Sequence, residues 1–110
     1  KNKKLLGICY GAELLALTLG GAVRKLDLPQ KGNEQIRIQR ENSLYNNDLQ
    51  VFESHGFEIS KLPNILLSIG ESENCKFEII QYEQKPIFGT QFHPEMSDDG
   101  KNLILKFCSL

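Results

Sequence analysis

Several residue types that would mark a functional class are scarce in this chain. It has no tryptophan, one methionine and two histidines, and its three cysteines, Cys9, Cys75 and Cys108, form no C-x-x-C pair. An odd number of widely spaced cysteines argues against a disulfide framework and against a structural zinc site. It is typical of a protein of the reducing cytoplasm, which is the location that we expect.

Neither sign of charge is in excess. The 110 residues carry 13 basic and 14 acidic side chains, which are interspersed, and the net charge is -1. Such a chain gives no electrostatic reason to bind nucleic acid or an anionic membrane, and no apolar run is long enough to cross a bilayer. We therefore expect one globular domain with neither nucleic acid nor a membrane as its partner.

The hydrophobic pattern predicts an α/β fold. Residues 5–8 are wholly apolar, as in a strand buried in a parallel sheet, and residues 12–19 are apolar nearly all round, which predicts a buried helix that ends at Gly20. The other predicted strands are residues 22–26, 35–39, 49–53, 65–69, 76–82 and 87–92, with turns at 29–33, 46–48 and 84–86. A last helix is expected to start at Ser97 or Asp98 and to bury Leu103, Ile104, Phe107 and Cys108.

The position of the first strand bears on domain organisation. A buried parallel strand needs neighbours on both sides, and the remaining predicted strands are mostly half-polar. We therefore expect part of the sheet upstream of Lys1, so that residues 1–110 form a domain that lacks its N-terminal part. The expected sheet is mostly parallel, with antiparallel strands added.

The sequence G-I-C-Y-G at residues 7–11 places a thiol between a predicted strand and a predicted helix. This is the cysteine form of the nucleophile elbow. Gly7 and Gly11 are expected to leave room for a tight turn, the helix N-terminus to lower the pKa of the Cys9 thiol, and the backbone N–H of Tyr10 to face a developing oxyanion. The alternative is that Cys9 is a small core residue, because buried cysteines are common.

A second motif, Q-F-H-P-E at residues 91–95, favours a catalytic role for the thiol. His93 and Glu95 are two residues apart and project to the same side of an extended chain, with Pro94 stiffening the link. Taken singly, His93 could be a core histidine and Glu95 a solvated charge. Together with Cys9 they supply a nucleophile, a base and a group that orients the base.

These two motifs, in this order, resemble those of the class I (triad) glutamine amidotransferases, from Leu5 to the C-terminus. The sequence S-H-G at residues 54–56, followed by L-P at 62–63, is most similar to the glutaminase part of GMP synthetases. H-G-F at 55–57 is also similar to the small subunit of carbamoyl-phosphate synthetase. The resemblance implies a flavodoxin-like α/β domain.

The resemblance also implies a substrate pocket. It places Ser54, Gly56 and Phe57 against the glutamine substrate, together with Tyr10 and Glu13. His55 either belongs to this pocket or is an ordinary histidine at a strand end, and both possibilities stay open.

This chain departs from the family pattern in two places. The upstream glycine loop that provides a second oxyanion amide is absent from this sequence. The family's usual glutamine four residues after the nucleophile is replaced by Glu13, as in some γ-glutamyl hydrolases of the same superfamily. Glu13 either contacts the substrate or turns outward as a first-turn acid that complements the helix dipole.

The implied reaction is hydrolysis of the L-glutamine side-chain amide through a γ-glutamyl thioester on Cys9. His93 would protonate the leaving ammonia, which would pass to a synthetase, such as one that aminates XMP. This half-reaction needs no metal and no organic cofactor. Two alternatives stay open: a stand-alone γ-glutamyl hydrolase, which Glu13 favours, and an inactive fragment that only binds a partner.

Overall fold

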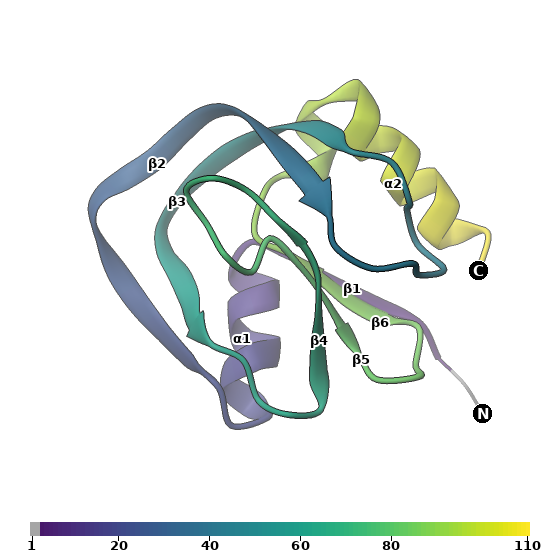
Figure 1. Cartoon of the computed structure of the whole chain (residues 1–110), viewed down its shortest axis with the longest axis horizontal. Helices are drawn as coiled ribbons and strands as arrows, with labels where there is room; N and C mark the ends of the chain where they lie inside the picture. The colour runs from purple at the N-terminus through teal and green to yellow at the C-terminus, as the bar shows by residue number, and fades with distance from the viewer. Residues whose placement is uncertain (1–2) are drawn as a thin grey trace.

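The computed structural model describes residues 3–110 and folds them into a curled sheet with a helix on either side (Figure 1). The strands are β1 (Leu5–Ile8), β2 (Ala22–Ile38), β3 (Leu49–Lys61), β4 (Leu66–Glu71), β5 (Ile79–Tyr82) and β6 (Ile87–Thr90). The helices are α1 (Tyr10–Thr18), the short 3₁₀ turn η1 (Pro94–Met96) and α2 (Asp98–Cys108). Within these residues the strands form one sheet in the order β1-β6-β5-β4-β2-β3. The expectation of an α/β fold is confirmed.

The sheet is mixed. β1 and β6 run parallel, whereas the neighbouring pairs β6–β5, β5–β4, β4–β2 and β2–β3 are antiparallel. The short turn between β5 and β6, where Gln84 takes a φ of 60°, explains one of these pairs, because a short turn can join only antiparallel strands. The expectation of a mostly parallel sheet is therefore not confirmed in the part of the chain that the structure describes.

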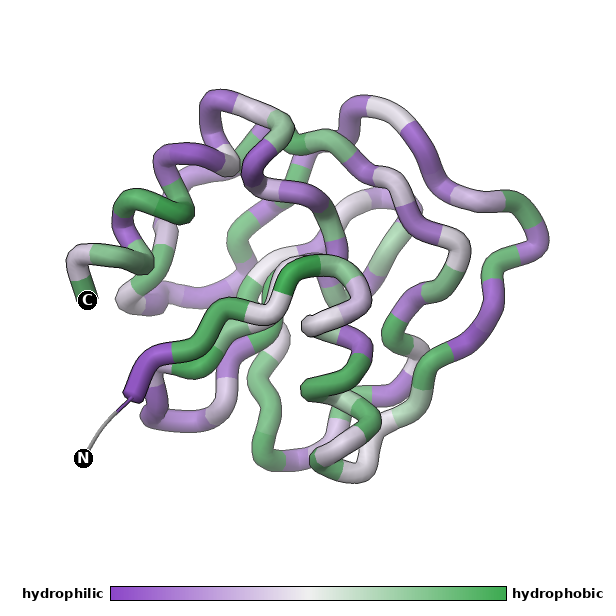
Figure 2. Tube along the Cα trace, turned by 180° about the vertical axis from the view of Figure 1, so that it is seen from behind, coloured by the Kyte–Doolittle hydropathy of each residue, from purple (hydrophilic) through white to green (hydrophobic). Residues whose placement is uncertain are grey.

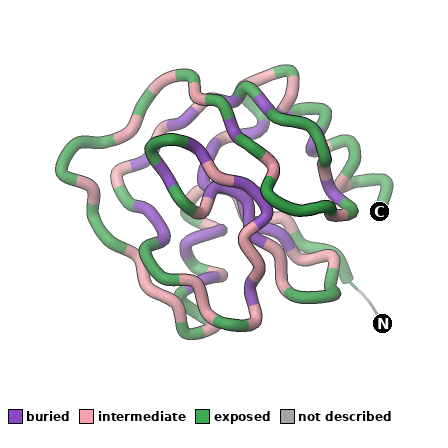
Figure 3. The backbone as a smooth tube through the Cα atoms, viewed as in Figure 1, coloured by how far each residue is buried: buried purple, intermediate pink, exposed green. Residues whose placement is uncertain are grey.

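Two hydrophobic clusters lie on opposite faces of the sheet. Ile79 packs in the cluster that contains Leu103 of α2, whereas its neighbour Ile80 packs in the cluster that contains Ala16 of α1. This division follows from the alternation of side chains along a strand. The buried residues gather in the central strands, between the helices, as Figure 3 shows.

Burial of the two N-terminal elements is less complete than the sequence predicts. β1 lies at the edge of the sheet, and Leu5 is 51% exposed. Only one side of α1 packs on the sheet, so that Ala12 and Ala16 are buried while Leu14 and Leu17 are 44% and 48% exposed. Figure 2 shows the hydrophobic residues along β1 and α1 from behind.

The last helix starts and packs mostly as predicted. The Ser97 side chain caps it by accepting a hydrogen bond from the Gly100 N–H at 2.9 Å. Leu103 is fully buried and Phe107 is half-buried, but Cys108 in the last turn is exposed, contrary to expectation. Among residues 3–110, no helix is long and apolar enough to cross a membrane.

The hairpin of β2 and β3 is much longer than the sequence predicts. The expected turn at residues 29–33 is instead part of β2, and β3 continues through residues 54–56 to Lys61. Pro29 lies where the pairing with β3 is interrupted, between Lys25 and Gln30, so its lack of an N–H costs no ladder hydrogen bond. Gly32 takes a φ of 127°, which glycine tolerates. Two predicted strands are also trimmed, since β5 starts at residue 79 and β6 ends at residue 90.

Candidate active site

Cys9 connects β1 to α1 in a strained turn. Its φ is 55° and its ψ is -102°, a conformation that a side-chain-bearing residue rarely takes. Its N–H donates to the Thr90 carbonyl at 2.7 Å, which anchors the turn to the end of β6. A Cβ on Gly7 would lie 2.8 Å from the carbonyl carbon and oxygen of Gly11, whereas a Cβ on Gly11 would meet nothing within 4 Å. Of the two glycines expected to make room for the turn, only Gly7 is sterically required.

The electrostatic surroundings of the thiol differ from the prediction. Burial raises the pKa of the Cys9 thiol above its usual value, and the charge of Glu13 raises this pKa next. A hydrogen bond from the Tyr10 N–H lowers the same pKa, as expected at a helix N-terminus, but Glu53 and Glu95 add further increases. The expectation of a lowered pKa for Cys9 is therefore wrong. The Tyr10 N–H lowers this pKa as predicted, but burial and the three carboxylates raise it by more. At neutral pH the thiol is protonated, so nucleophilic attack needs a base.

His93 and Glu95 lie together as the sequence predicts. The His93 Nδ1 is 2.9 Å from the Glu95 Oε2. The backbone conformation between them differs from the prediction. Glu95 belongs to the 3₁₀ turn η1, which starts at Pro94, and not to an extended strand. Since the two side chains are 28% and 50% exposed, this contact orients the His93 ring more than it stabilises the fold.

β3 links the histidine motif to the thiol. The His93 N–H donates to the Phe52 carbonyl at 3.0 Å, and the Cys9 Sγ lies 3.8 Å from the Ser54 carbonyl oxygen. Carbonyl groups two residues apart on a strand point to the same side and are separated by about 6–7 Å. The Cys9 thiol and the His93 backbone thus contact neighbouring carbonyl groups on the same edge of β3. Catalytic roles for Cys9, His93 and Glu95 stay predictions at this point.

Glu13 points into the protein. Its side chain is buried, and its Oε2 accepts a hydrogen bond from the Gln91 Nε2 at 2.8 Å. The outward-turned alternative for Glu13 is therefore wrong. Sequence reasoning did not single out Gln91, although it is the first residue of the Q-F-H-P-E motif. The other amide atom of Gln91, Oε1, is buried without a hydrogen-bond partner among the described groups.

The predicted pocket residues Ser54, Gly56 and Phe57 lie within β3. Ser54 and Gly56 are half-buried, and Phe57 is 47% exposed. His55 is buried rather than at a strand end, and its two ring nitrogens contact the Phe57 carbonyl and the Glu53 carboxylate, each at 2.7 Å. Each ring nitrogen of His55 thus has a close polar partner, which fixes the orientation of the ring.

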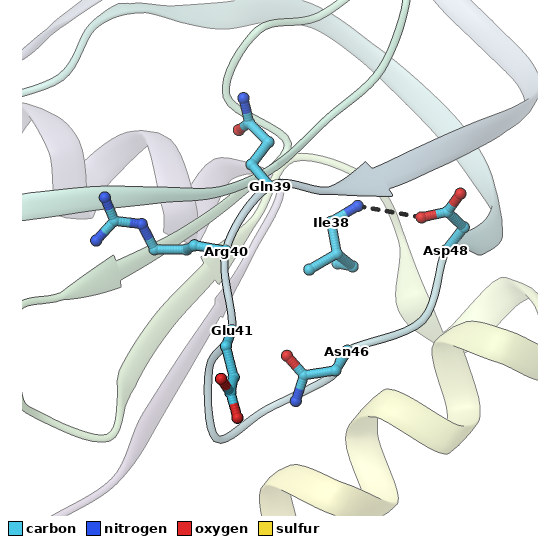
Figure 4. A pocket seen from close by; sticks show the side chains of 6 residues that line it. All are labelled: Ile38, Gln39, Arg40, Glu41, Asn46 and Asp48. Atoms are coloured by element: carbon cyan, nitrogen blue, oxygen red, sulfur yellow. Dashed lines mark hydrogen bonds between the residues drawn. The ribbon is translucent and has the colours of Figure 1, made fainter.

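A separate hollow lies at the end of β2. It has a volume of about 470 Å³ and is lined by Ile38, Gln39, Arg40, Glu41, Asn46 and Asp48 (Figure 4). The Asp48 carboxylate accepts from the Ile38 N–H at 3.3 Å. The lining includes none of the predicted site residues.

Among residues 3–110, no group of three or more His, Cys, Asp or Glu side chains lies close enough together to hold a metal ion.

Known sequences match this chain over nearly all its length. The family model for class I glutamine amidotransferases matches residues 1–108. A glutamine-hydrolyzing GMP synthase subunit of Methanocaldococcus jannaschii is 33% identical over 116 residues, which cover 99% of this chain and 62% of that protein. The glutamine-hydrolyzing GMP synthase of Borrelia garinii is 38% identical, over 94% of this chain and 21% of that protein.

Solved structures agree. A crystal structure from Thermoplasma acidophilum, described as that of a GMP synthase subunit, has a TM-score of 0.89 at 29% identity and covers 99% of this chain and 57% of that one. A glutamine amidotransferase from Thermotoga maritima has a TM-score of 0.74 at 27% identity and covers 94% of this chain and 46% of that one. This chain thus spans less than two thirds of the length of these relatives. Its sequence and its fold both place it in the class I glutamine amidotransferase family.

Proposed function

We propose that this chain carries the glutaminase centre of an amidotransferase like these GMP synthase subunits. It would hydrolyse the side-chain amide of L-glutamine and deliver the ammonia to a synthetase subunit or domain in the cytoplasm. The observation that carries the proposal is the Cys9 thiol, held in a strained turn against the same edge of β3 that binds the His93 backbone.

Because burial raises the pKa of the Cys9 thiol, the reaction starts from the protonated thiol and not from a thiolate. The thiol proton passes to His93 as the sulfur attacks the amide carbon, because too little thiolate exists beforehand. The Tyr10 N–H donates to the oxyanion. His93 then returns the proton to the leaving nitrogen, the C–N bond breaks, and ammonia leaves a γ-glutamyl thioester on Cys9. Water, deprotonated by His93, cleaves the thioester to glutamate and the free thiol.

Substrate preference tests this function against its rival. The whole protein is expected to release glutamate and ammonia from L-glutamine faster than it cleaves γ-glutamyl peptides. Coupled assays of both products, with each substrate at matched concentrations, measure the two rates. A preference for γ-glutamyl peptides would instead favour a stand-alone γ-glutamyl hydrolase. No turnover of either substrate would favour a module that only binds a partner.

Glu13 is proposed to contact the amino-acid end of glutamine. An ionised carboxylate only accepts hydrogen bonds, so it favours the α-ammonium and offers nothing to the α-carboxylate. Replacement Glu13→Gln restores a donor and is expected to change KM for glutamine severalfold while kcat at its pH optimum stays within about twofold, the pattern of altered uniform binding. Steady-state kinetics measure both constants. An unchanged KM for glutamine and for γ-glutamyl peptides would mean that Glu13 only holds Gln91.

A further inference from the structure

Gln91, directly after β6, is a fully buried polar residue that no step of the proposed reaction uses. Its Nε2 donates to the Glu13 Oε2 at 2.8 Å, whereas its Oε1 is buried without a partner among the described groups. An unpaired buried acceptor costs stability, and an apolar side chain of the same shape would avoid this cost. The amide is therefore better explained by what it does to Glu13 than by packing.

The Gln91 amide can take only one orientation beside Glu13. A carboxylate accepts hydrogen bonds and does not donate them, so the Gln91 Nε2 must face it and the Oε1 must face away. The Gln91 backbone is fixed as well, because its N–H donates to the Glu78 carbonyl at 2.8 Å. A fixed donor thus holds one oxygen of the Glu13 side chain, which could otherwise turn about several single bonds.

Close packing of α1 on β6 brings the two residues together. A Cβ on Gly89 would lie 2.9 Å from a side-chain carbon of α1, so this approach needs a glycine in β6. The Cys9 N–H donates to the Thr90 carbonyl at 2.7 Å, which already anchors the backbone of the turn. The bond from Gln91 to Glu13 joins the same two elements through side chains alone, and what it fixes is the direction of a carboxylate.

The second oxygen of Glu13 remains for a ligand. Glu13 is 6% exposed, and unlike the Gln91 Oε1, its own Oε1 is neither hydrogen-bonded to a described residue nor fully enclosed. The Glu13 N–H donates to the Cys9 carbonyl at 3.1 Å, so residues 9 and 13 lie on the same side of the first turn of α1. We propose that Gln91 is a positioning residue, which holds the Glu13 Oε2 so that the Oε1 binds the α-ammonium group of glutamine. The inference rests on the proposed function for its substrate but not on hydrolysis.

A ligand without the ammonium group separates this role from a structural one. Glutaramate is glutamine with hydrogen in place of the α-amino group, and it keeps the side-chain amide and the carboxylate. If Gln91 acts through Glu13, its loss weakens the binding of L-glutamine and spares that of glutaramate. If Gln91 only ties α1 to β6, its loss weakens the binding of both ligands alike.

Gln91→Met removes the hydrogen bond to Glu13 and keeps the length of the side chain. Its matched control is Gln81→Met on β5, which also removes the bond of a glutamine amide, here from the Nε2 to the Lys85 carbonyl at 3.0 Å. Glu13→Ala removes the carboxylate itself. All proteins in the titrations carry Cys9→Ser, so that bound L-glutamine is not hydrolysed during the measurement.

Isothermal titration calorimetry on the whole protein measures Kd for L-glutamine and for glutaramate. Gln91→Met is expected to raise Kd for L-glutamine about fivefold or more and to leave Kd for glutaramate within about twofold. Gln81→Met should leave both constants within about twofold. Glu13→Ala is expected to raise Kd for L-glutamine about tenfold. Because Gln91 acts through Glu13, adding Gln91→Met to Glu13→Ala should raise this Kd by less than a further twofold or so.

An equal rise in Kd for both ligands, or an unchanged Kd for L-glutamine, would overturn the proposal. Fully additive effects in the double variant, or no binding of L-glutamine to the Cys9→Ser protein, would overturn it as well. If Gln91→Met does not fold, Gln91→Asn, whose amide is one methylene group too short to reach Glu13, is held to the same expectations. Absence of glutaminase activity in the protein with Cys9 intact, with the expected difference between the two ligands, would reject the proposed function and leave the role of Gln91 supported.

Discussion

Replacement of Cys9 by serine is expected to lower kcat for glutamine hydrolysis in the whole protein by at least about 10³-fold, since loss of a nucleophile removes most of the rate that a catalytic set provides. A hydroxyl has nearly the shape of a thiol, so the strained turn at residue 9, with its φ of 55°, is kept. The hydroxyl is also a far weaker acid, and His93 cannot readily take its proton. Release of glutamate and ammonia measures the loss.

Cys108→Ser is the control for this replacement. Cys108 is exposed in the last turn of α2, and its substitution is expected to leave kcat within about twofold of wild type, as for most surface sites. Mass analysis of wild type after acid quenching should also find a γ-glutamyl adduct on the peptide that contains Cys9. Retention of more than a tenth of wild-type kcat by Cys9→Ser would reject Cys9 as the nucleophile.

The parts of the site that the sequence predicts are those that depend on local geometry. A cysteine between a short apolar strand and a helix, with Gly7 two residues before it, specifies the tight turn by steric space alone. The pairing of His93 with Glu95 likewise depends on a spacing of two residues. Here the distance was predictable although the backbone is a 3₁₀ turn and not a strand.

Contacts between distant segments could not be predicted in the same way. Glu13 and Gln91 are separated by 78 positions, and only the packing of α1 against the end of β6 brings them together. The thiol pKa shows the consequence. The helix N-terminus acts on Cys9 as predicted, but burial and carboxylates from α1, β3 and η1 reverse the net shift.

The prediction of the β2–β3 hairpin was too short for a related reason. Proline and glycine at residues 29 and 32 are turn signals when taken alone. In the structure, β3 supplies a pairing partner on either side of an interruption in the ladder, so the chain stays extended. Turn signals read from the sequence alone cannot reveal such a pairing partner. For the same reason the predicted strand ended at residue 53, just before Ser54, whose carbonyl faces the thiol.

Gly100→Ala is expected to reduce the free energy of unfolding by about 2–4 kcal/mol, at or above the usual cost of overpacking. A Cβ at residue 100 would collide with the Pro94 carbonyl oxygen and would lie 2.5 Å from the Pro94 Cα. This backbone cannot move freely, because the Met96 N–H donates to the His93 carbonyl at 3.1 Å and Ser97 caps α2. The better helix propensity of alanine, worth about 1 kcal/mol, is too small to compensate.

Gly11→Ala is the matched control, since it makes the same change in the first turn of α1. No atom lies within 4 Å of a Cβ at residue 11, so this variant is expected to be neutral or up to about 1 kcal/mol more stable than wild type. Because both variants gain similar helix propensity, the difference between their urea unfolding free energies isolates the contact of α2 with Pro94. The same contact sets the turn that carries His93 and Glu95, so Gly100→Ala should also lower kcat for glutamine under conditions where the variant stays folded. Equal stability of the two variants would show that α2 does not pack against this turn as described.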